Sequence, residues 1–490
     1  MQLSDEYLTQ HATLVANLGI AIPNYDRRKL EVGIVHLGLG AFHRSHQAVF
    51  NEEVLNLTGD LRWGICAVAF SNEQLKNQIN AQDGLYTNVR CGKEQNFQIV
   101  GCIKQALVAS KQMQEILETL ALPSVKLVSL TVTEKGYCLN EAGELDINSA
   151  NVQHDIKHVL EPKTAIGILV AGFYVRFLKS QSAFNVIACD NLPHNGDKLK
   201  KATVALANEI RPELARWIEA NAHFPNTMVD CITPKTEVTT VSAVETNCRF
   251  NDSVPVQREP FAQWVIEDIP GIERPQWEKA GVTFTSDVAG FEKAKLRILN
   301  GTHSALAYIG SLLSIDTVYN AINNTQIKAF ISGLLEHEII PSIDAPVGLD
   351  LADYAKAILE RYDNPSIRHL LNQIAADGSI KIPVRTLEPI KENLATGRSI
   401  ERLSIVVAAW IRFIVSSVEQ QTEISDPKKQ QMQVVVRGFS GDSKQDVAAF
   451  LSIEGIVEKD LLANPKFVDS VVQAYSEIDS FLASLANTQL

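Results

Sequence analysis

The amino-acid sequence predicts an α/β protein in which a parallel β-sheet occupies the first part of the chain and mostly helices occupy the second. Short apolar runs alternate with helix-like segments up to about residue 285. Beyond that point the apolar residues follow the spacing of amphipathic helices, with few β-rich runs. All seven cysteines precede residue 250, which also indicates that the two parts differ in architecture. We place the boundary near residue 285.

Composition narrows the class of protein. The chain has 490 residues, a formal charge of −12 and 46% apolar residues, typical of a globular protein of two or three domains. An acidic protein lacks the basic footprint of a non-specific nucleic-acid binder. The most apolar helical segment, 403–418, contains Arg412 and is expected to be buried rather than membrane-spanning. We expect no secretory signal, a cytoplasmic location with free thiols, no membrane partner, and a monomer or small homo-oligomer.

Four apolar runs are expected to form the parallel sheet, at residues 34–37, 63–70, 125–132 and 184–189. Ligands of such sheets lie beyond the carboxyl ends of the strands. Gly38, residues 133–135 and the pair Asp190 and Asn191 each follow a predicted strand. These segments are therefore expected to converge on one crevice.

The loop after the first strand has the glycines of a nucleotide-binding turn. Gly38 and Gly40 follow the strand directly, and a helix is expected to continue through residues 45–57. Glycines there permit a tight turn and let backbone N–H groups approach a pyrophosphate at a helix N-terminus. His43 takes the place of the usual third glycine, and an ordinary turn is an equal alternative.

The residue that would select the cofactor is not clear from the second strand. An acidic residue there usually binds the ribose hydroxyls of NAD. The one acidic residue after this strand is Glu73, which lies further along the chain than the usual selector. The nearby Lys76 is a poor partner for the 2′-phosphate of NADP. The sequence therefore leaves NAD and NADP both open.

The segment KLRILNGTH, residues 295–303, contains the strongest catalytic signal. Treated as an α-helix, it places Lys295, Asn300, His303 and the preceding Glu292 in one sector. A partly desolvated lysine is a general base, and an asparagine amide stabilises a developing alkoxide. The alternative from spacing alone is a solvated face on which Lys295 and Glu292 pair, and Gly301 weakens the helix prediction.

Several motifs together resemble the polyol-specific long-chain dehydrogenase/reductase family, also called the mannitol dehydrogenase family. They are HLGLGAFHRSHQA (36–48), WGIC (63–66), SLTVTEKGY (129–137), CDNLPHNG (189–196), NTMVD (226–230) and KLRILNGTH (295–303). The resemblance implies a Rossmann-type dinucleotide-binding domain (1–285), a mostly helical substrate-binding and catalytic domain (286–490), and metal-free hydride transfer. The implied cofactor is NAD, with NADP not excluded. The implied cofactor-binding residues are Gly38, Leu39, Gly40, Ala41 and Phe42.

The resemblance also implies residue roles. Lys295 would be the general acid/base, Asn191 and Asn300 would polarise the reacting oxygen, and His303 would orient the substrate. Glu292 resembles the family's proton-path carboxylate. Asp230 and Lys381 resemble its substrate contacts.

The substrate is expected to be a sugar acid or a polyol. The segment 377–385, which ends in Arg385, is similar to the branch that reduces D-fructuronate to D-mannonate, and a carboxylate substrate needs such a cation. Relatives that oxidise mannitol to fructose tend to have arginine where this chain has Gln373. Oxidation of mannitol to fructose remains the alternative activity. An ordinary surface arginine is an equal alternative to this carboxylate-binding role for Arg385. Cys231 departs from the family, which often has arginine there.

Two further patterns are interpreted as coincidental. His154 and His158 have the spacing of helical metal ligands, but no third ligand accompanies them. Tyr25 and Lys29 have the spacing of short-chain dehydrogenases but precede the nucleotide loop. A catalytically silent sugar-acid or nucleotide binder is the rival class. Retention of Lys295, Asn300 and His303 is evidence against it, because a binder needs no base.

Overall fold

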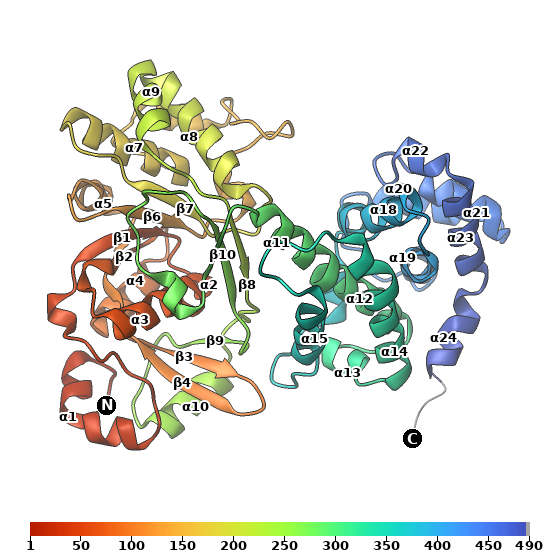
Figure 1. Ribbon diagram of the computed structural model, residues 1–490, viewed down its shortest axis with the longest axis horizontal. Helices are drawn as coiled ribbons and strands as arrows, with labels where there is room; N and C mark the ends of the chain where they lie inside the picture. Colours follow the sequence, from red (N-terminus) through yellow and green to blue (C-terminus); the bar gives the residue numbers. More distant parts are fainter. Residues whose placement is uncertain (487–490) are drawn as a thin grey trace. The chain divides into compact units, whose positions relative to one another are not determined.

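The computed structural model describes residues 1–486 (Figure 1). The chain divides into two compact units, Met1–Ala289 and Gly290–Leu490, and each is described by itself below. No helix in the described part of the chain combines the length and the apolarity needed to cross a bilayer.

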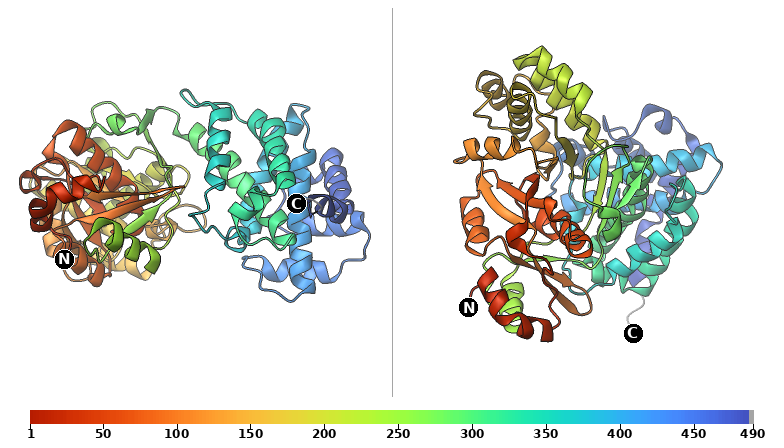
Figure 2. Two further views of the ribbon diagram at one scale, coloured as in Figure 1. Left: turned by 90° about the horizontal axis from the view of Figure 1, so that it is seen from below. Right: turned by 60° about the vertical axis from the view of Figure 1, so that its left-hand side comes forward.

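A five-stranded sheet forms the centre of the first unit (Figures 1 and 2). All its strand pairs are parallel, as predicted, and the strand order is β5-β2-β1-β6-β7. The strands span Val32–Leu37 (β1), Gly64–Ala69 (β2), Ile103–Val108 (β5), Leu127–Leu130 (β6) and Asn185–Ala188 (β7). Strand β5 lies at the sheet edge and contains the polar residues Lys104 and Gln105, of which Lys104 is exposed. For that reason the apolar runs in the sequence do not reveal it.

The strand order reverses at β1. Strands β2 and β5 lie on one side of β1, and β6 and β7 lie on the other. A reversal of this kind leaves a crevice beyond the carboxyl ends of the two central strands, here β1 and β6. Gly38 and residues 133–135, two of the segments predicted to converge, follow β1 and β6, and the third, Asp190 and Asn191, follows the neighbouring strand β7.

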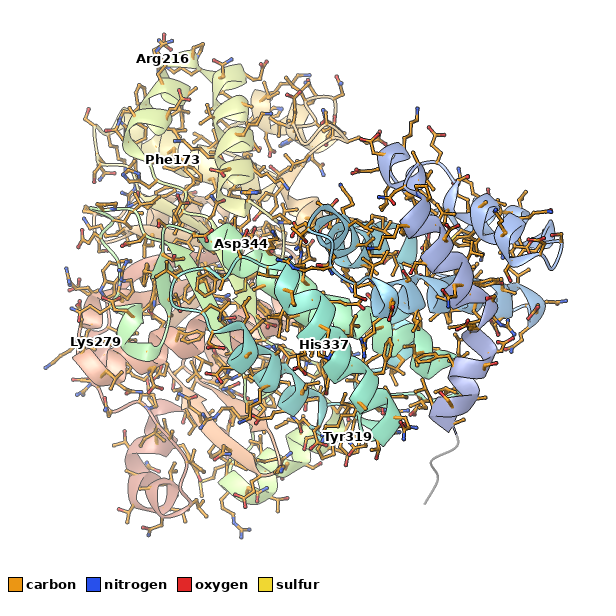
Figure 3. All side chains as sticks on the ribbon, turned by 45° about the vertical axis from the view of Figure 1, so that its right-hand side comes forward. Phe173, Arg216, Lys279, Tyr319, His337 and Asp344 are labelled. Atoms are coloured by element: carbon orange, nitrogen blue, oxygen red, sulfur yellow. The ribbon has the colours of Figure 1, made fainter. Side chains whose placement is uncertain are left out.

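Both faces of the sheet are buried against helices. On one face, Val35, Leu37 and Val128 belong to a core shared with α5 (Met113–Leu120), α7 (Ala165–Leu178) and α8 (Asn195–Ile210). Phe173 on α7, labelled in Figure 3, stacks on Phe184 with ring centroids 4.1 Å apart. The alternate residues, such as Ile34, face a second core with α3 (Gln47–Thr58) and α4 (Glu73–Ala81).

The helix after the nucleotide loop is interrupted. The sequence predicted that one helix runs on through residues 45–57, but α2 spans only Ala41–Ser45 and α3 starts at Gln47. His46 has φ −124° and ψ −86°, which are not helical angles. Its ring packs on Phe42 and its Nε2 lies 2.9 Å from the carbonyl oxygen of Gln263, so tertiary contacts hold the break.

Two small sheets complete the first unit, and the sequence did not predict either. Strand β8 (Thr227–Asp230) is antiparallel to β10 (Gln263–Glu267), which is parallel to β11 (Thr283–Thr285). The other sheet joins the hairpin of β3 (Tyr86–Cys91) and β4 (Gln95–Val100) to β9 (Val256–Arg258). The first of these sheets places Asp230 at the end of β8.

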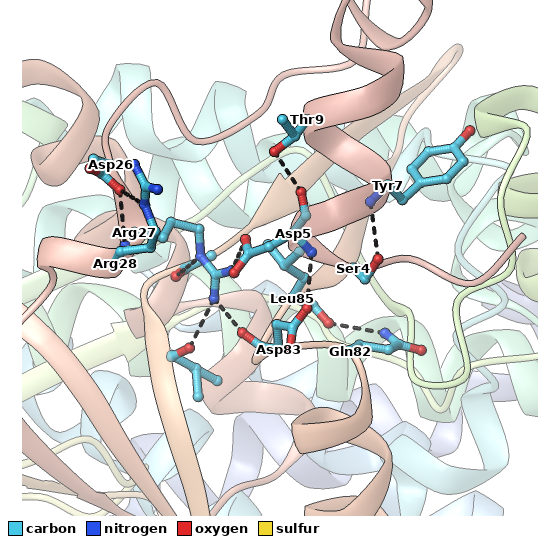
Figure 4. Close-up of polar contacts among 12 residues, drawn as sticks. Ser4, Asp5, Tyr7, Thr9, Asp26, Arg27, Arg28, Gln82, Asp83 and Leu85 are labelled. Carbon is cyan, nitrogen blue, oxygen red and sulfur yellow. Dashed lines mark hydrogen bonds and ion pairs between the residues drawn. The ribbon is translucent and has the colours of Figure 1, made fainter.

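Arg27 ties the N-terminal segment to the edge of the central sheet (Figure 4). Its guanidinium donates to the carbonyl oxygens of Gly101, at 2.9 Å, and Ile103, at 3.3 Å, and pairs with Asp5 of α1 (Asp5–Asn17). The side-chain amide of Asn80 bonds both backbone groups of Ala106 on β5. Side chains therefore cover the exposed edge of the sheet, which prevents pairing with another chain.

The second unit is helical, as predicted. Helix α12 (Thr302–Leu312) packs against the long helix α19 (Glu401–Glu419), whose segment 403–411 is largely buried. Within the described residues of this unit, 290–486, three short π-helical segments interrupt the α-helices: η5 (Lys295–Gly301), η6 (Leu335–Ile339) and η8 (Pro383–Leu387). Figure 3 labels His337 on η6. Segment η5 contacts both of the others.

Candidate active site

Gly38 permits a close approach between the first strand and the loop after β6. Its φ is +114°, and a Cβ there would lie 2.2 Å from the carbonyl oxygen of Thr131. Thr131 Oγ1 donates to the Gly38 carbonyl oxygen at 2.9 Å. Any side chain at position 38 would therefore separate the two loops at the centre of the crevice.

The backbone of the glycine loop fits a dinucleotide. The N–H groups of Gly38 and Leu39 both donate to the Val68 carbonyl oxygen, so these two donors hold the loop rather than a ligand. The donors that a helix leaves unused are those of its first turn, here the turn that contains Ala41 and Phe42. A Cβ at position 40 would contact only the Gly38 carbonyl oxygen, at 3.7 Å, which leaves the loop open to a phosphate.

A histidine stack replaces the missing third glycine. The ring of His43 on α2 lies flat on that of His36 on β1, with centroids 3.4 Å apart and planes 10° apart. His36 contacts Ser129 Oγ at 2.8 Å and Thr131 Oγ1 at 2.9 Å. Burial lowers the pKa of His36 to about 3 and that of His43 well below its usual value, so two neutral rings pack the helix on the strand.

Asp190 fixes the loop after β6. Its Oδ1 accepts from the N–H groups of Val132 and Thr133, each at 2.8 Å, and its Oδ2 accepts from the Tyr137 hydroxyl at 3.2 Å. Thr133 has φ +64°, an unfavourable angle that these bonds maintain. Burial raises the pKa of Asp190 despite these donors. Asn191, the next residue, is exposed within the loop.

Asp230 is held at the end of β8 and is buried, with 5% of its surface exposed. Asn195, at the start of α8, connects β8 to β7: its amide nitrogen donates to the carbonyl oxygens of Asp190 and Thr227, at 3.0 and 2.9 Å. Asn195 therefore ties the backbone after β7 to the start of β8, the strand that ends at Asp230. The sequence did not single out Asn195, although it lies in the CDNLPHNG motif.

The acidic residue after β2 already has a cationic partner. Glu73 Oε2 lies 2.5 Å from the ammonium of Lys111, and this bond lowers the pKa of Glu73. Both side chains are largely exposed. A carboxylate paired in this way is a weak ligand for a ribose hydroxyl. Both NAD and NADP therefore stay open as cofactors, as they did from the sequence.

Lys295 begins a π-helical turn rather than continuing an α-helix. Helix α11 (Val288–Ala294) leads into η5, and α12 follows it. The prediction of a regular α-helix is therefore wrong over this segment. Hydrogen bonds in a π-turn join residues five apart, so Lys295 and Asn300 lie about one turn apart on the same side. Lys295 is 8% exposed and Asn300 is half-buried.

Side chains from distant segments cap the carbonyl groups of the π-turn. The hydroxyl of Tyr362, on α15 (Leu351–Tyr362), donates to the Leu299 carbonyl oxygen at 2.9 Å and lies 2.7 Å from Thr302 Oγ1. Tyr362 and Thr302 are both buried. No sequence pattern points to Tyr362, because the contact joins residues 63 apart.

Arg385 caps the next carbonyl of the same turn. Its Nη1 donates to the Asn300 carbonyl oxygen at 3.4 Å and to Ser304 Oγ at 3.1 Å. The guanidinium is half-buried, and burial lowers its pKa. Arg385 is therefore not the surface arginine that the sequence left as an alternative. Ser304, which is 1% exposed, accepts from Arg385, and no sequence pattern singled it out.

Lys381 lies one turn before Arg385, on α17 (Gly378–Ile382). Its ammonium donates to the carbonyl oxygens of Ala376, at 2.6 Å, and Ile374, at 3.3 Å. Burial and the charge of Arg385 lower its pKa. The two cations predicted to contact substrate thus lie near each other, and Arg385 also contacts Asn300.

His303 follows the π-turn and is 6% exposed. Its ring lies 4.7 Å from the ring of Tyr362 and 4.9 Å, edge to face, from that of His369. Burial places the pKa of His303 well below its usual value and also lowers that of His369. No described residue bonds the Nε2 of His303 or the Nδ1 of His369. Two neutral rings with unused nitrogens suit hydroxyl groups of a substrate.

Glu292 is half-buried on α11, one turn before Lys295. The second unit therefore brings Glu292, Lys295, Asn300, His303, Lys381 and Arg385 onto η5, η8 and their flanking helices. A buried amine, an amide and neutral imidazoles can exchange a proton with a substrate hydroxyl and stabilise its oxyanion. Among residues 1–486 no group of three or more His, Cys, Asp or Glu side chains is arranged to hold a metal ion.

Two family models match the chain. One, described as the mannitol dehydrogenase Rossmann domain, matches residues 32–279. The other, described as the mannitol dehydrogenase C-terminal domain, matches residues 287–479.

Curated relatives match over nearly their whole length. D-mannonate oxidoreductase of Escherichia coli strain K12 is 40% identical over 94% of this chain and 96% of its own. Mannitol 2-dehydrogenase of Aspergillus fumigatus is 34% identical over 98% of this chain and 97% of its own.

Solved structures are also similar. Mannitol 2-dehydrogenase of Pseudomonas fluorescens, in a ternary complex with NAD and D-mannitol, has a TM-score of 0.80 at 34% identity and covers 99% of both chains. A substrate-free D-sorbitol dehydrogenase has a TM-score of 0.90 at 28% identity and covers 100% of both chains.

Proposed function

This chain is an oxidoreductase of the mannitol dehydrogenase family, and we propose that it reduces D-fructuronate to D-mannonate reversibly, with NAD(H) and without a metal. The observation that carries the proposal is the buried Lys295 on a π-turn that also contains Asn300, whose carbonyl oxygen accepts from Arg385. Such a turn combines a proton donor, an oxyanion donor and a cation that suits a carboxylate.

The first unit is proposed to bind the cofactor through the segment from Gly38 to Phe42. When bound, the nicotinamide supplies the hydride for the substrate carbonyl carbon, or accepts it in the reverse direction. Gly38 keeps the loop tight, Leu39 anchors it in the core, and the first turn of α2 faces the pyrophosphate. The open face at Gly40 and the parallel sheet with its switch point at β1 support this assignment.

Lys295 moves the proton. In reduction its ammonium Nζ–H bond breaks and the proton passes to the carbonyl oxygen as the C–H bond forms; in oxidation the neutral amine removes the hydroxyl proton. The side-chain N–H groups of Asn191 and Asn300 donate to the oxygen as its charge develops. His303 orients a neighbouring hydroxyl, and Glu292 passes protons between Lys295 and solvent. Low exposure of Lys295 supports the role, because desolvation favours the neutral amine.

The sugar acid is proposed to contact Asp230 through a hydroxyl, and Lys381 and Arg385 through its carboxylate. The proximity of Arg385 to Asn300 supports an acid, since it brings a fixed cation to the catalytic turn. The alternative is the interconversion of mannitol and fructose, which the likeness to a mannitol 2-dehydrogenase bound to D-mannitol favours. We place the reaction in the cytoplasm and leave monomer and small homo-oligomer both open.

A substrate panel tests the proposal. We would measure kcat/KM for fructuronate, tagaturonate, fructose, mannitol and arabinitol, with NADH or NADPH for the ketones and the oxidised cofactors for the polyols. Fructuronate with NADH should exceed every neutral substrate by at least tenfold. A larger value for fructose or mannitol would reject the uronate assignment and favour the alternative. Binding of NADH without turnover of any substrate would favour a catalytically silent binder.

A further inference from the structure

Four arginines in the described part of the chain are at least nine-tenths buried: Arg44, Arg176, Arg258 and Arg297, at 6, 1, 6 and 4% exposure. Three of them have acceptors. Arg176 donates to four backbone carbonyl oxygens, Arg297 pairs with Glu392, and Arg44 donates to the carbonyl oxygens of Gly40 and Val254. Arg258 is the exception.

The Nε and Nη1 atoms of Arg258 are buried and have no hydrogen-bond partner among the described residues. A guanidinium is always charged in a protein, and burying it without an acceptor costs several kcal/mol. Strand β9, which ends at Arg258, is ordered by its ladder with β3, so the side chain is not left there by a loose backbone. The cost indicates a partner that the protein chain itself does not supply.

The surroundings of Arg258 connect the two ligand-binding segments of the first unit. Burial raises the pKa of the Cys231 thiol to about 11, while the charge of Arg258 opposes that rise, so Arg258 lies close to a neutral thiol. Cys231 follows Asp230 in the chain. Thr233 Oγ1, two residues further on, lies 2.8 Å from Ser45 Oγ on α2, the helix that starts at the glycine loop, and β9 itself packs on α2.

The neighbouring carboxylate does not neutralise Arg258. Glu259 Oε1 accepts from the backbone N–H of Ile232 at 2.7 Å, and no ion pair joins Glu259 to Arg258. Arg385 and Lys381, the cations assigned to the substrate above, already donate to carbonyl oxygens of the protein. Among residues 1–486, the thiol of Cys231 is the one acceptor near Arg258, and a sulfur is a weak acceptor, so Nε and Nη1 of Arg258 stay without a partner.

We propose that Arg258 is the cationic partner of a buried oxyanion, supplied by a bound ligand, at a subsite between Asp230 and helix α2. A carboxylate and a phosphate offer the same chemistry to a guanidinium. The source is therefore either the carboxylate of the sugar acid, in which case the inference rests on the function proposed above, or a phosphate of the dinucleotide.

The test compares R258M with a matched control, R90Q. Arg90 faces Arg258 in the β3–β9 ladder but is exposed. We would measure the melting temperature of the ligand-free protein, the Kd of NADH by fluorescence titration, and the thermal protection given by D-mannonate. Removing an unpaired buried charge should raise the ligand-free melting temperature by about 2–4 °C, while ligand affinity falls. R90Q should change none of the three quantities.

The two binding measurements distinguish a cofactor phosphate from a substrate carboxylate. A Kd for NADH raised at least tenfold in R258M identifies a cofactor phosphate. An unchanged Kd for NADH with D-mannonate protection lost identifies the substrate carboxylate, and KM should then rise at least tenfold more for fructuronate than for fructose. Neither binding measurement needs turnover. A wild-type protein that D-mannonate does not protect would reject the proposed function, and the NADH titration alone would then decide whether Arg258 binds a cofactor phosphate.

The inference is overturned where R258M changes NADH affinity and D-mannonate protection by less than twofold, whatever happens to stability, because Arg258 would then be a structural residue. If R258M does not fold, R258K replaces it. Lysine keeps the charge but loses the two-pronged geometry, so weaker binding of one ligand supports the inference and full binding of both overturns it.

Discussion

Arg385 bonds the backbone carbonyl oxygen of Asn300, 3.4 Å from its Nη1, and so connects the residue assigned to the substrate carboxylate with the turn that carries the amide assigned to the oxyanion. From this position we expect Arg385 to influence both substrate binding and catalysis. Substrate charge and oxyanion stabilisation are therefore expected to be coupled in this protein.

The first prediction concerns Arg385 itself. R385Q should raise KM for fructuronate at least tenfold more than KM for fructose, because only the acid loses a charge-assisted bond. It should also lower kcat for both substrates several-fold, since the Asn300 carbonyl oxygen loses its donor. Steady-state kinetics with the two ketones measure both effects. R398Q, at an exposed arginine, is the control. Equal increases in KM for acid and neutral substrates would contradict a carboxylate role.

The second prediction concerns the general acid/base. K295A should lower kcat by about 10²–10⁴-fold, which is the usual contribution of a positioned proton donor. The Kd of NADH should stay within about twofold, because the glycine loop belongs to the first unit. K293A is the matched control and should keep kcat close to that of the wild-type protein. Lys293 lies two residues from Lys295, but its ammonium pairs with Glu392. Normal turnover in K295A would remove the proposed mechanism.

The apolar runs predicted four of the five central strands, because a buried parallel strand is apolar on both faces. Edge strand β5 was missed because Lys104 and Gln105 interrupt its apolar run. The π-turn at Lys295 could not be predicted, since Tyr362 and Arg385, both more than 60 residues away, supply donors to its carbonyl groups. Propensity and spacing contain no information about such contacts. The histidine that replaces a glycine at position 43 was visible, but its stacking partner His36 was not.

The third prediction concerns Glu52 on α3, which is fully buried. Its Oε2 accepts from the Gly101 N–H at 2.8 Å and the Tyr25 hydroxyl at 3.0 Å, yet burial raises its pKa to about 7. The folded state therefore holds this proton more tightly than the unfolded state. The associated stability is present below about pH 4.5 and is lost as pH rises through 7, by on the order of 3 kcal/mol.

Urea unfolding between pH 5 and pH 8 measures this effect as a difference. E52Q should lose less stability than the wild-type protein over that range, because its neutral amide does not ionise. E53Q, at the exposed neighbouring residue, should follow the wild-type curve. Parallel curves for E52Q and the wild-type protein would show that Glu52 titrates as an ordinary carboxylate. The contact also gives Tyr25 a structural role, in agreement with the interpretation of its spacing to Lys29 as coincidence.

The last prediction tests whether Tyr362 positions the catalytic turn. Y362F removes the hydroxyl that donates to the Leu299 carbonyl oxygen and leaves a buried acceptor without it, at a cost of about 1–3 kcal/mol. Y308F is matched to it: Tyr308 is also buried, and its hydroxyl donates to the Ala375 carbonyl oxygen, away from the π-turn. Thermal unfolding should show a lower melting temperature for both variants. Only Y362F should also lower kcat, by at least fivefold with NADH affinity unchanged, because only there does the carbonyl group belong to the turn between Lys295 and Asn300. A kcat as high in Y362F as in Y308F would mean that the π-turn holds its geometry without the tyrosine.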